Sequence, residues 1–254
     1  MRHEALNLAD PMPNKPDEHH VIGQSQNFPE DLTSFMQSNV GDPAAEVSLP
    51  VLVITSLNLN TTCYQHFILK LRTHILPRIA AIHQELNPQA SLDTTIINLP
   101  DDLDDLVLQD HLLQLNHVLF KGNRIYRHCL FRINYTTYDL QRESDSINTR
   151  NHQDIMLLSN SDINDHPFSY ARVLGIFHAN IIYTGPGSKD FQSRRIEFLW
   201  VRWFEVLQNR VSAWEQHTLD TIRFLPMADK GAFGFVDPTD VLRGCHIIPS
   251  FADG

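Results

Sequence analysis

Arginines and tyrosines crowd one stretch of the chain, and they are the residues best suited to recognition chemistry. Residues 121–150 hold six Lys or Arg against three Asp or Glu, a net charge of +3. Guanidinium groups contact phosphates and tyrosine rings stack on nucleobases, so this composition suits nucleic-acid binding. The same residue types dominate the hot spots of protein–protein interfaces. A third interpretation is that Arg132, Arg142 and Arg202 pair with local carboxylates while the aromatic rings fill the core.

These residues, with several from later segments, form the predicted binding surface. In one unbroken strand Arg124 and Arg132 would share a face, opposite Arg127, because side chains alternate along a strand. Trp200 and Trp203 have opposite parity, so at least one of them should lie in the core. The candidate binding residues are Arg124, Tyr126, Arg127, Arg132, Tyr138, Arg142, Tyr170, Arg194, Arg195 and Trp203.

The sequence shows no clear catalytic constellation. Metal-dependent nuclease chemistry needs two or three carboxylates that converge from separate elements. The candidates Asp139, Asp145 and Asp154 lie in polar connecting segments, where carboxylates commonly form turns. The three cysteines are far apart and form no Cys-x-x-Cys pair of the zinc-binding kind. We therefore predict a binding protein without catalytic residues, metal or cofactor, and keep a metal-dependent nuclease as the enzyme alternative.

The charge of the chain is unevenly distributed. Residues 1–120 hold 5 Lys or Arg against 15 Asp or Glu, a net −10, whereas residues 121–254 hold 15 of each. Contact with nucleic acid must therefore be local. No apolar run approaches the roughly 20 residues that span a bilayer, and the N-terminus lacks the apolar core of a signal peptide. Together with the few cysteines, this predicts an intracellular protein without a membrane partner.

Three regions are expected in an α+β fold. Residues 1–48 are rich in proline and polar residues, which predicts a disordered leader. Residues 49–116 form a small α/β region, with helical periodicity over 64–86 and Pro77 expected to kink or split that helix. This region also includes predicted strands at Leu49–Ile54 and Thr94–Leu99 and a helix start at Pro100.

Residues 117–254 are predicted to form an antiparallel β-barrel or sandwich. Gly122-Asn123 is typical of a two-residue hairpin turn, here between strands at 117–121 and 124–135. Thr184–Ser188 has the composition of another turn. Further strands are expected at Ile155–Leu158, Tyr170–Ile182, Ile196–Phe204, Thr221–Leu225 and Val241–Ile248.

Several blocks of this second half resemble a fungal protein family. The blocks are Arg132–Asp139, Asn151–Met156, His166–His178, Arg195–Phe204 and Gly234–Pro249. They are similar to a region of large proteins in mushroom-forming fungi, which look like products of Plavaka and Kyakuja–Dileera–Zisupton transposable elements. The resemblance covers about residues 65–254. It implies an accessory region that lies downstream of a transposase core, and it assigns no activity.

A second resemblance lies within the first. Tyr170–Val173, Val201–Phe204 and Leu242–Ile247 look like landmarks of bromo-adjacent homology domains. Those domains are β-barrel chromatin readers that bind histone tails or nucleosomes, which implies chromatin or nucleic acid as partner and a protein partner as the alternative. Trp203 would then be one wall of a methyl-lysine cage. The sequence offers no assignable second and third wall, which leaves the ligand open.

Overall fold

The computed structural model describes residues 19–23, 28–32, 34–35, 67–86, 113–136, 142–159, 166–188, 190–207 and 219–248. Its elements are β1 (His20–Ile22), β2 (Phe28–Asp31), α3 (Phe67–Leu86), β3 (Val118–His128), β4 (Phe131–Thr136), β5 (Arg142–Ile147), β6 (Asp154–Leu158), β7 (Phe168–Tyr183), β8 (Arg194–Val206), β9 (Ile222–Phe224), β10 (Phe233–Val236), the 3-10 helix η2 (Pro238–Asp240) and β11 (Val241–Gly244). The strands predicted at Leu49–Ile54 and Thr94–Leu99 and the helix start at Pro100 lie outside the described residues.

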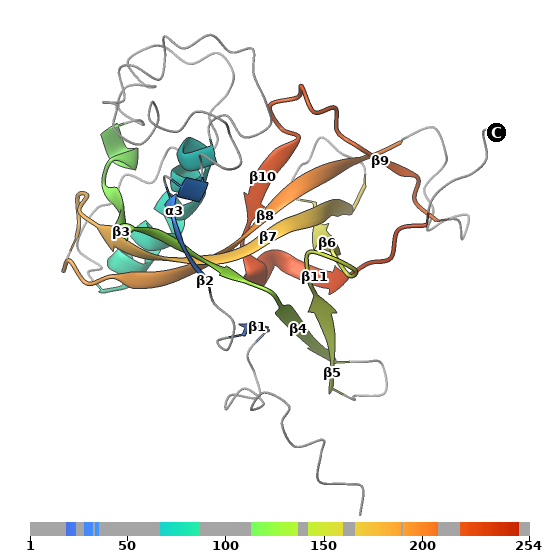
Figure 1. Ribbon diagram of the computed structural model, residues 1–254, viewed down its shortest axis with the longest axis horizontal. Helices are drawn as coiled ribbons and strands as arrows, with labels where there is room; N and C mark the ends of the chain where they lie inside the picture. Colours follow the sequence, from blue (N-terminus) through green and yellow to red (C-terminus); the bar gives the residue numbers. More distant parts are fainter. Residues whose placement is uncertain are drawn as a thin grey trace, which may run out of the picture.

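Two long strands, β7 and β8, form the centre of the fold (Figure 1). The main sheet runs in the order β10-β8-β7-β3-β2, while β6 also pairs with β7, β11 with β6, and β9 with β8. Every pairing among the described strands is antiparallel. The predicted α+β class with antiparallel sheets is therefore confirmed. The strands predicted within 155–248 are all present, although β11 ends at Gly244.

The main sheet is open, so the predicted barrel is wrong for the described part of the chain. Its strand path ends at β2 on one side and at β10 on the other, and these two strands do not pair. Closure of a sheet removes its edges and buries one face. Here a helix covers one face, and β4, β5, β6 and β11 contribute to the core on the other. The apolar residues are therefore buried without closure.

Helix α3 covers one face of the main sheet. Its buried residues recur at helical spacing, with Leu71, Ile75 and Ile79 all 0% exposed. The helix runs unbroken through Pro77, so the predicted split did not occur. Among the described residues, no helix is both long and apolar enough to cross a membrane.

Alternate residues of β8 supply two separate cores. Phe198 and Trp200 pack in the first core, with α3, β3 and β7. Leu199 and Val201 point the opposite way into the second core, with β4, β6 and β11. Because α3 and β8 share the first core, the boundary predicted between 116 and 117 does not separate two cores in the described residues.

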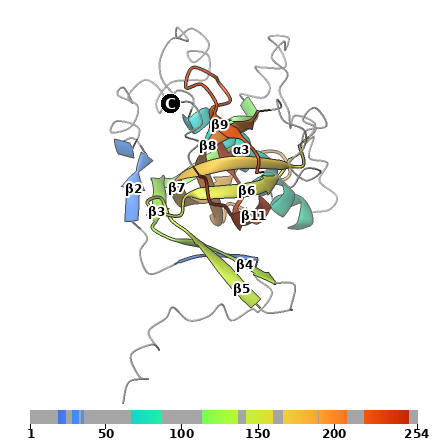
Figure 2. The same ribbon diagram turned by 90° about the vertical axis from the view of Figure 1, so that its right-hand side faces the viewer.

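Strands β4 and β5 form a hairpin that extends from the main sheet in both views (Figures 1 and 2), which we call the β4–β5 arm. Strand β1 pairs along β4 and makes this a three-stranded sheet. The base of the arm is fixed because Phe131, Ile133 and Ile147 are buried in the second core.

The Gly122-Asn123 pair is not a hairpin turn, which corrects the prediction. Both residues have positive φ, 66° and 53°, but they lie within the single strand β3. Phe120 pairs with Ile181 of β7, and the next paired residue, Ile125, pairs with Ala179. Strand β3 therefore has extra residues at this point, and they bulge out of the ladder. A type I′ turn and this bulge need the same left-handed backbone, and the partner strand decides between them. Strand β3 also ends at His128, so Arg132 lies in a separate strand, β4.

Part of the predicted disordered leader is ordered. Within residues 1–48, β1 pairs with β4 and β2 pairs with β3. Ile22 is buried in the second core, and Leu32 and Phe35 are buried in the first. Short segments of this kind gain their order from an existing sheet edge and core, which local composition does not reveal. The prediction of disorder is therefore wrong for these residues.

Candidate functional site

The predicted binding residues lie on five strands and do not converge on one pocket. Tyr138 lies outside the described residues. Arg124, Tyr126 and Arg127 are on β3, Arg132 on β4, Arg142 on β5, Tyr170 on β7, and Arg194, Arg195 and Trp203 on β8. Arg124, Arg127 and Arg142 are exposed, whereas Tyr170 and Trp203 are half-buried.

Arg194 and Arg195 make ion pairs within the chain. The Arg194 guanidinium donates to both carboxylate oxygens of Asp190, at 2.9 and 3.1 Å, and its NH1 lies 3.2 Å from His83 Nε2. The Arg194 hydrogen bonds hold the pKa of Asp190 below its usual value. Arg195 donates to Glu197 Oε1 from Nε and NH2, at 2.9 and 2.6 Å. Both arginines are therefore engaged by carboxylates within the chain.

Tyr170 and Trp203 are also engaged within the fold. The Tyr170 hydroxyl donates to Asp220 at 2.5 Å, and burial raises the pKa of Tyr170 far above its usual value. Trp203 packs against the second core, while Trp200 is buried in the first. The alternation of side chains along the strand had predicted a core position for at least one of them. Nearby, the ring of Phe224 stacks on Phe204 at 4.1 Å between centroids. A methyl-lysine cage needs open ring faces, so these contacts favour a packing role.

The β4–β5 arm has two chemically distinct faces. Directly opposed residues of antiparallel strands share a face, and the register pairs Arg132 with Ser146, Asn134 with Ser144 and Thr136 with Arg142. These six residues form what we call the outer face. The inner face holds the remaining described residues of the two strands, Phe131, Ile133, Tyr135, Glu143, Asp145 and Ile147.

Both carboxylates of the arm strands are on the inner face, where they have partners. Asp145 Oδ2 accepts from Arg243 Nε at 2.7 Å and from the Gly244 amide at 3.0 Å. Glu143 accepts from the Tyr135 hydroxyl at 2.8 Å. The Arg243 guanidinium also lies 3.5 Å from the centroid of the Tyr135 ring. The outer face, as far as it is described, therefore carries two arginines and four uncharged polar residues without a carboxylate.

A cluster of histidines that the sequence did not reveal lies at the edge of the second core. The rings of Tyr126 and His178 are stacked, 4.6 Å apart and 4° from parallel. His128 Nδ1 lies 2.8 Å from the Gly23 carbonyl, so that nitrogen carries the proton and donates. In neutral rings His128 Nε2 then accepts from His178 Nδ1, at 2.7 Å. Burial, followed by the charge of Arg195, lowers the pKa of His178 to about 4, and burial also lowers the pKa of His128, so both rings are neutral at pH 7.

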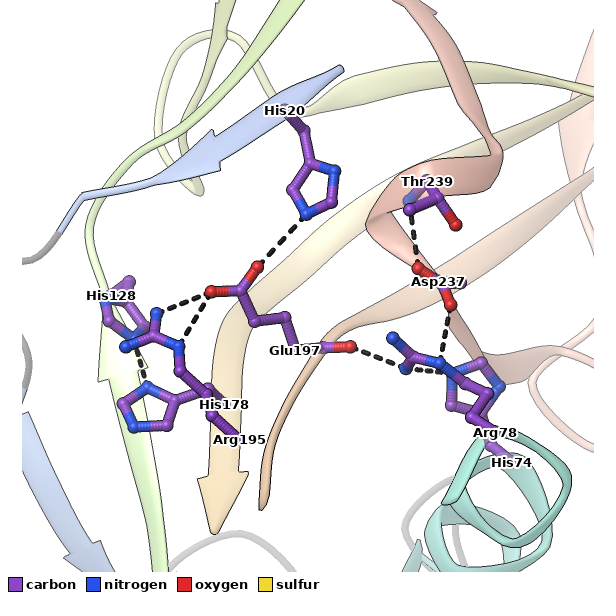
Figure 3. A network of polar contacts seen from close by, with 9 residues as sticks. All are labelled: His20, His74, Arg78, His128, His178, Arg195, Glu197, Asp237 and Thr239. Atoms are coloured by element: carbon purple, nitrogen blue, oxygen red, sulfur yellow. Dashed lines mark hydrogen bonds and ion pairs between the residues drawn. The ribbon is translucent and has the colours of Figure 1, made fainter. Parts of the chain in front are cut away.

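Glu197, which lies opposite His178 in the β7–β8 register, contacts the N-terminal strand and α3 (Figure 3). Its carboxylate lies 3.1 Å from His20 Nε2 on β1, and its carbonyl accepts from Arg78 NH1 at 2.6 Å. Arg78 also pairs with Asp237, which accepts from the Thr239 amide and so caps η2. Burial alone would raise the pKa of Glu197, but hydrogen bonds from His20 and Arg195 lower it overall. The network therefore joins β1, β8, α3 and η2.

No local spacing could have shown this network, because its members are far apart in the sequence. His128 and His178, for example, are separated by 50 residues. The one available signal was His178 itself, a polar residue between Phe177 and Ala179 in an apolar strand. Among the described residues, no three His, Cys, Asp or Glu side chains are grouped so that they could hold a metal ion.

The carboxylates considered for nuclease chemistry are paired with arginine where they are described. Asp139 lies outside the described residues, and Asp145 pairs with Arg243. Asp154 accepts from Arg172 through both oxygens, at 2.7 and 3.0 Å. Burial raises the pKa of Cys245 to about 12, which keeps this thiol protonated and poorly nucleophilic at neutral pH.

Comparisons with known proteins add no family to this description. No protein-family model matches the chain, and no curated protein or solved structure is significantly similar to it. The resemblances found in the sequence therefore stay predictions.

Proposed function

We propose that this chain is a non-catalytic module that binds nucleic acid through the outer face of the β4–β5 arm. The observation that carries the proposal is the separation of charge on the arm. Arg132 and Arg142 lie on the outer face, while Glu143 and Asp145 are held on the inner face by Tyr135 and Arg243. Within β4 and β5, the outer face therefore carries two arginines and four neutral polar side chains.

The chemistry of this face matches a phosphate backbone. Arginine, serine, threonine and asparagine are the side chains that most often contact phosphates. Beyond the residues of β4 that pair with β1, the arm is a two-stranded ribbon, and such a ribbon has the dimensions to enter the major groove of duplex DNA. Arg124 is also exposed, on β3, with Asp31 of β2 directly opposite it in the register. Because the whole chain is acidic, the affinity would depend on this local surface.

The proposal extends to the setting in which the module acts. The fungal resemblance supports an accessory module of a transposon-derived protein, and the weaker resemblance to bromo-adjacent homology domains supports chromatin as its location. Both would place the protein in the nucleus. A protein–protein module or an inactive transposon remnant is the alternative, and it predicts no salt-dependent binding to nucleic acid.

The first prediction concerns the outer face. Arg132→Ala with Arg142→Ala should weaken binding to labelled duplex DNA roughly tenfold and make the slope of log affinity against log salt shallower by about 2, because two phosphate contacts are lost. Fluorescence anisotropy at several salt concentrations measures both quantities. The matched control is Arg223→Ala with Lys230→Ala, which removes the same charge at exposed positions. Equal losses in both double variants would indicate a diffuse charge effect and contradict the proposed face.

A second double variant tests whether the surface extends to the main sheet. Arg124→Ala with Arg127→Ala removes two exposed cations of β3. We expect a smaller loss of DNA affinity than at the arm, with an unchanged circular dichroism spectrum. If this variant loses more affinity than the arm variant, the centre of the interface is β3. If neither variant changes affinity, the nucleic-acid proposal is wrong.

A further inference from the structure

Arg202 is a half-buried cation without a carboxylate partner among the described residues. It lies on β8, opposite Phe233 of β10 and Arg172 of β7. Its guanidinium carbon is 4.0 Å from the centroid of Phe224 and 5.8 Å from that of Phe233. Its Nε is buried and makes no hydrogen bond. The aromatic contacts stabilise the charge, but they leave the buried Nε without a hydrogen-bond acceptor.

The neighbouring charges are already matched, which distinguishes Arg202 from them. Arg172 is held by both oxygens of Asp154. Asp220 accepts from the Tyr170 hydroxyl at 2.5 Å and lies 3.1 Å from His166 Nε2. Arg202 is therefore the cation of this cluster that lacks an anion. Burying an unpaired charge is costly, so an anion from outside the described chain would stabilise it.

We infer that Arg202 is the anchor of a carboxylate-binding site. A carboxylate matches the planar fork of one guanidinium and carries the single charge that Arg202 lacks. A phosphate monoester is disfavoured, because Arg202 supplies one positive charge and the neighbouring Arg172 is already held by Asp154. The rings of Phe224 and Phe233 provide an apolar border, which suits an organic carboxylate. Its source is either a free carboxylic acid or an acidic residue of a peptide.

The site is independent of the arm. Arg202 lies on β8 beside β9 and β10, and Figures 1 and 2 place β9 at the far end of the molecule from the β4–β5 arm. Loss of DNA binding would therefore leave this inference intact, and loss of carboxylate binding would leave the proposed function intact.

The test is an NMR titration of the full chain that follows the arginine Nε–H signals. The probes are benzoate, a doubly capped peptide with one internal glutamate, and inorganic phosphate. We expect a saturable shift of the Arg202 Nε–H signal with at least one carboxylate probe, and a weaker response to phosphate. Binding of benzoate alone identifies a small-molecule site, and binding of the peptide alone identifies a peptide site. A stronger response to phosphate, or no response to either carboxylate, would overturn the inference.

Substitution separates binding from packing. Arg202→Gln should weaken the carboxylate affinity at least tenfold, and Arg202→Lys, which keeps the charge and loses the fork, should weaken it less. Arg223→Gln is the matched control, because Arg223 lies on the adjacent strand β9 and is paired with Glu205. If Arg202→Gln fails to fold, Arg202→Lys decides the question. Unchanged affinity in a folded Arg202 variant would overturn the site.

Discussion

Replacing Phe67 with alanine is expected to destabilise the whole described fold, not α3 alone. Phe67 lies on α3, and its ring is 5.4 Å from Trp200 on β8 and 5.0 Å from Phe235 on β10. Its side chain is 3% exposed, so truncation leaves a cavity between the helix and the sheet. A buried Phe→Ala change costs about 3–5 kcal/mol of unfolding free energy. Since the helix and the strands share one core, we expect a single cooperative transition at lower denaturant concentration.

Urea unfolding followed by two signals tests this expectation. Far-UV circular dichroism reports the backbone, and tryptophan fluorescence includes the buried Trp200. Both midpoints should fall together in Phe67→Ala. The control is Leu86→Ala at the end of the same helix, where the side chain is 43% exposed and the change should stay within about 0.5 kcal/mol. Two separate transitions, with the fluorescence midpoint unchanged, would mean that residues 49–116 fold apart from the sheet.

The long apolar elements could be predicted because their own periodicity defines them. Leu71, Ile75 and Ile79 recur at helical spacing, so α3 was evident although it contains Pro77. Likewise, β7 and β8 are rich in β-branched and aromatic residues, and the turn at Thr184–Ser188 separates them. In both cases the signal lies within the element and does not depend on a partner.

Features that depend on a distant partner could not be predicted. The backbone at Gly122-Asn123 is compatible with a turn or a bulge, and β7 determines the result by pairing with both halves of β3. Strand β1 is only three residues long and is ordered by β4, a partner more than a hundred residues away. Likewise, the sheet would close only if its two end strands, β2 and β10, paired with each other. Local sequence does not encode such relations.

The same distinction applies to the candidate site. Composition identified Arg132 and Arg142, but the register of β4 with β5 places them on one face. Composition also suggested Arg194 and Arg195, whose partners Asp190 and Glu197 are nearby in the sequence. In contrast, Arg202 was expected to pair with a local carboxylate, and the described fold shows no such partner for it. An unsatisfied donor becomes visible only when the surroundings of a side chain are known.

The second large effect is expected on acidification, and His74 is, with His178, one of its two largest sources. His74 lies on α3, with its ring 6.0 Å from that of Phe235 and its Nε2 3.5 Å from Arg78 NH1. Burial and the Arg78 charge lower the pKa of His74 from 6.5 to about 4, while Asp237 opposes the shift. The folded state therefore resists protonation that the unfolded chain accepts. This contribution to stability is complete above pH 6.5 and is lost as the pH falls towards 4.

The size of this effect follows from the shift in pKa, since each unit is worth about 1.4 kcal/mol. Between pH 6.5 and pH 5 His74 alone should lower the unfolding free energy by about 2 kcal/mol. The slope of stability against pH, measured by urea unfolding in this range, should therefore be smaller in His74→Gln than in the unchanged protein. The slope is informative even if the variant is less stable at pH 7, because glutamine does not titrate. His152→Gln, at an exposed loop position, should leave the slope unchanged. Equal slopes in His74→Gln and the unchanged protein would show that His74 is protonated as easily in the folded state as in the unfolded chain. Burial and the Arg78 charge would then not lower the pKa of His74.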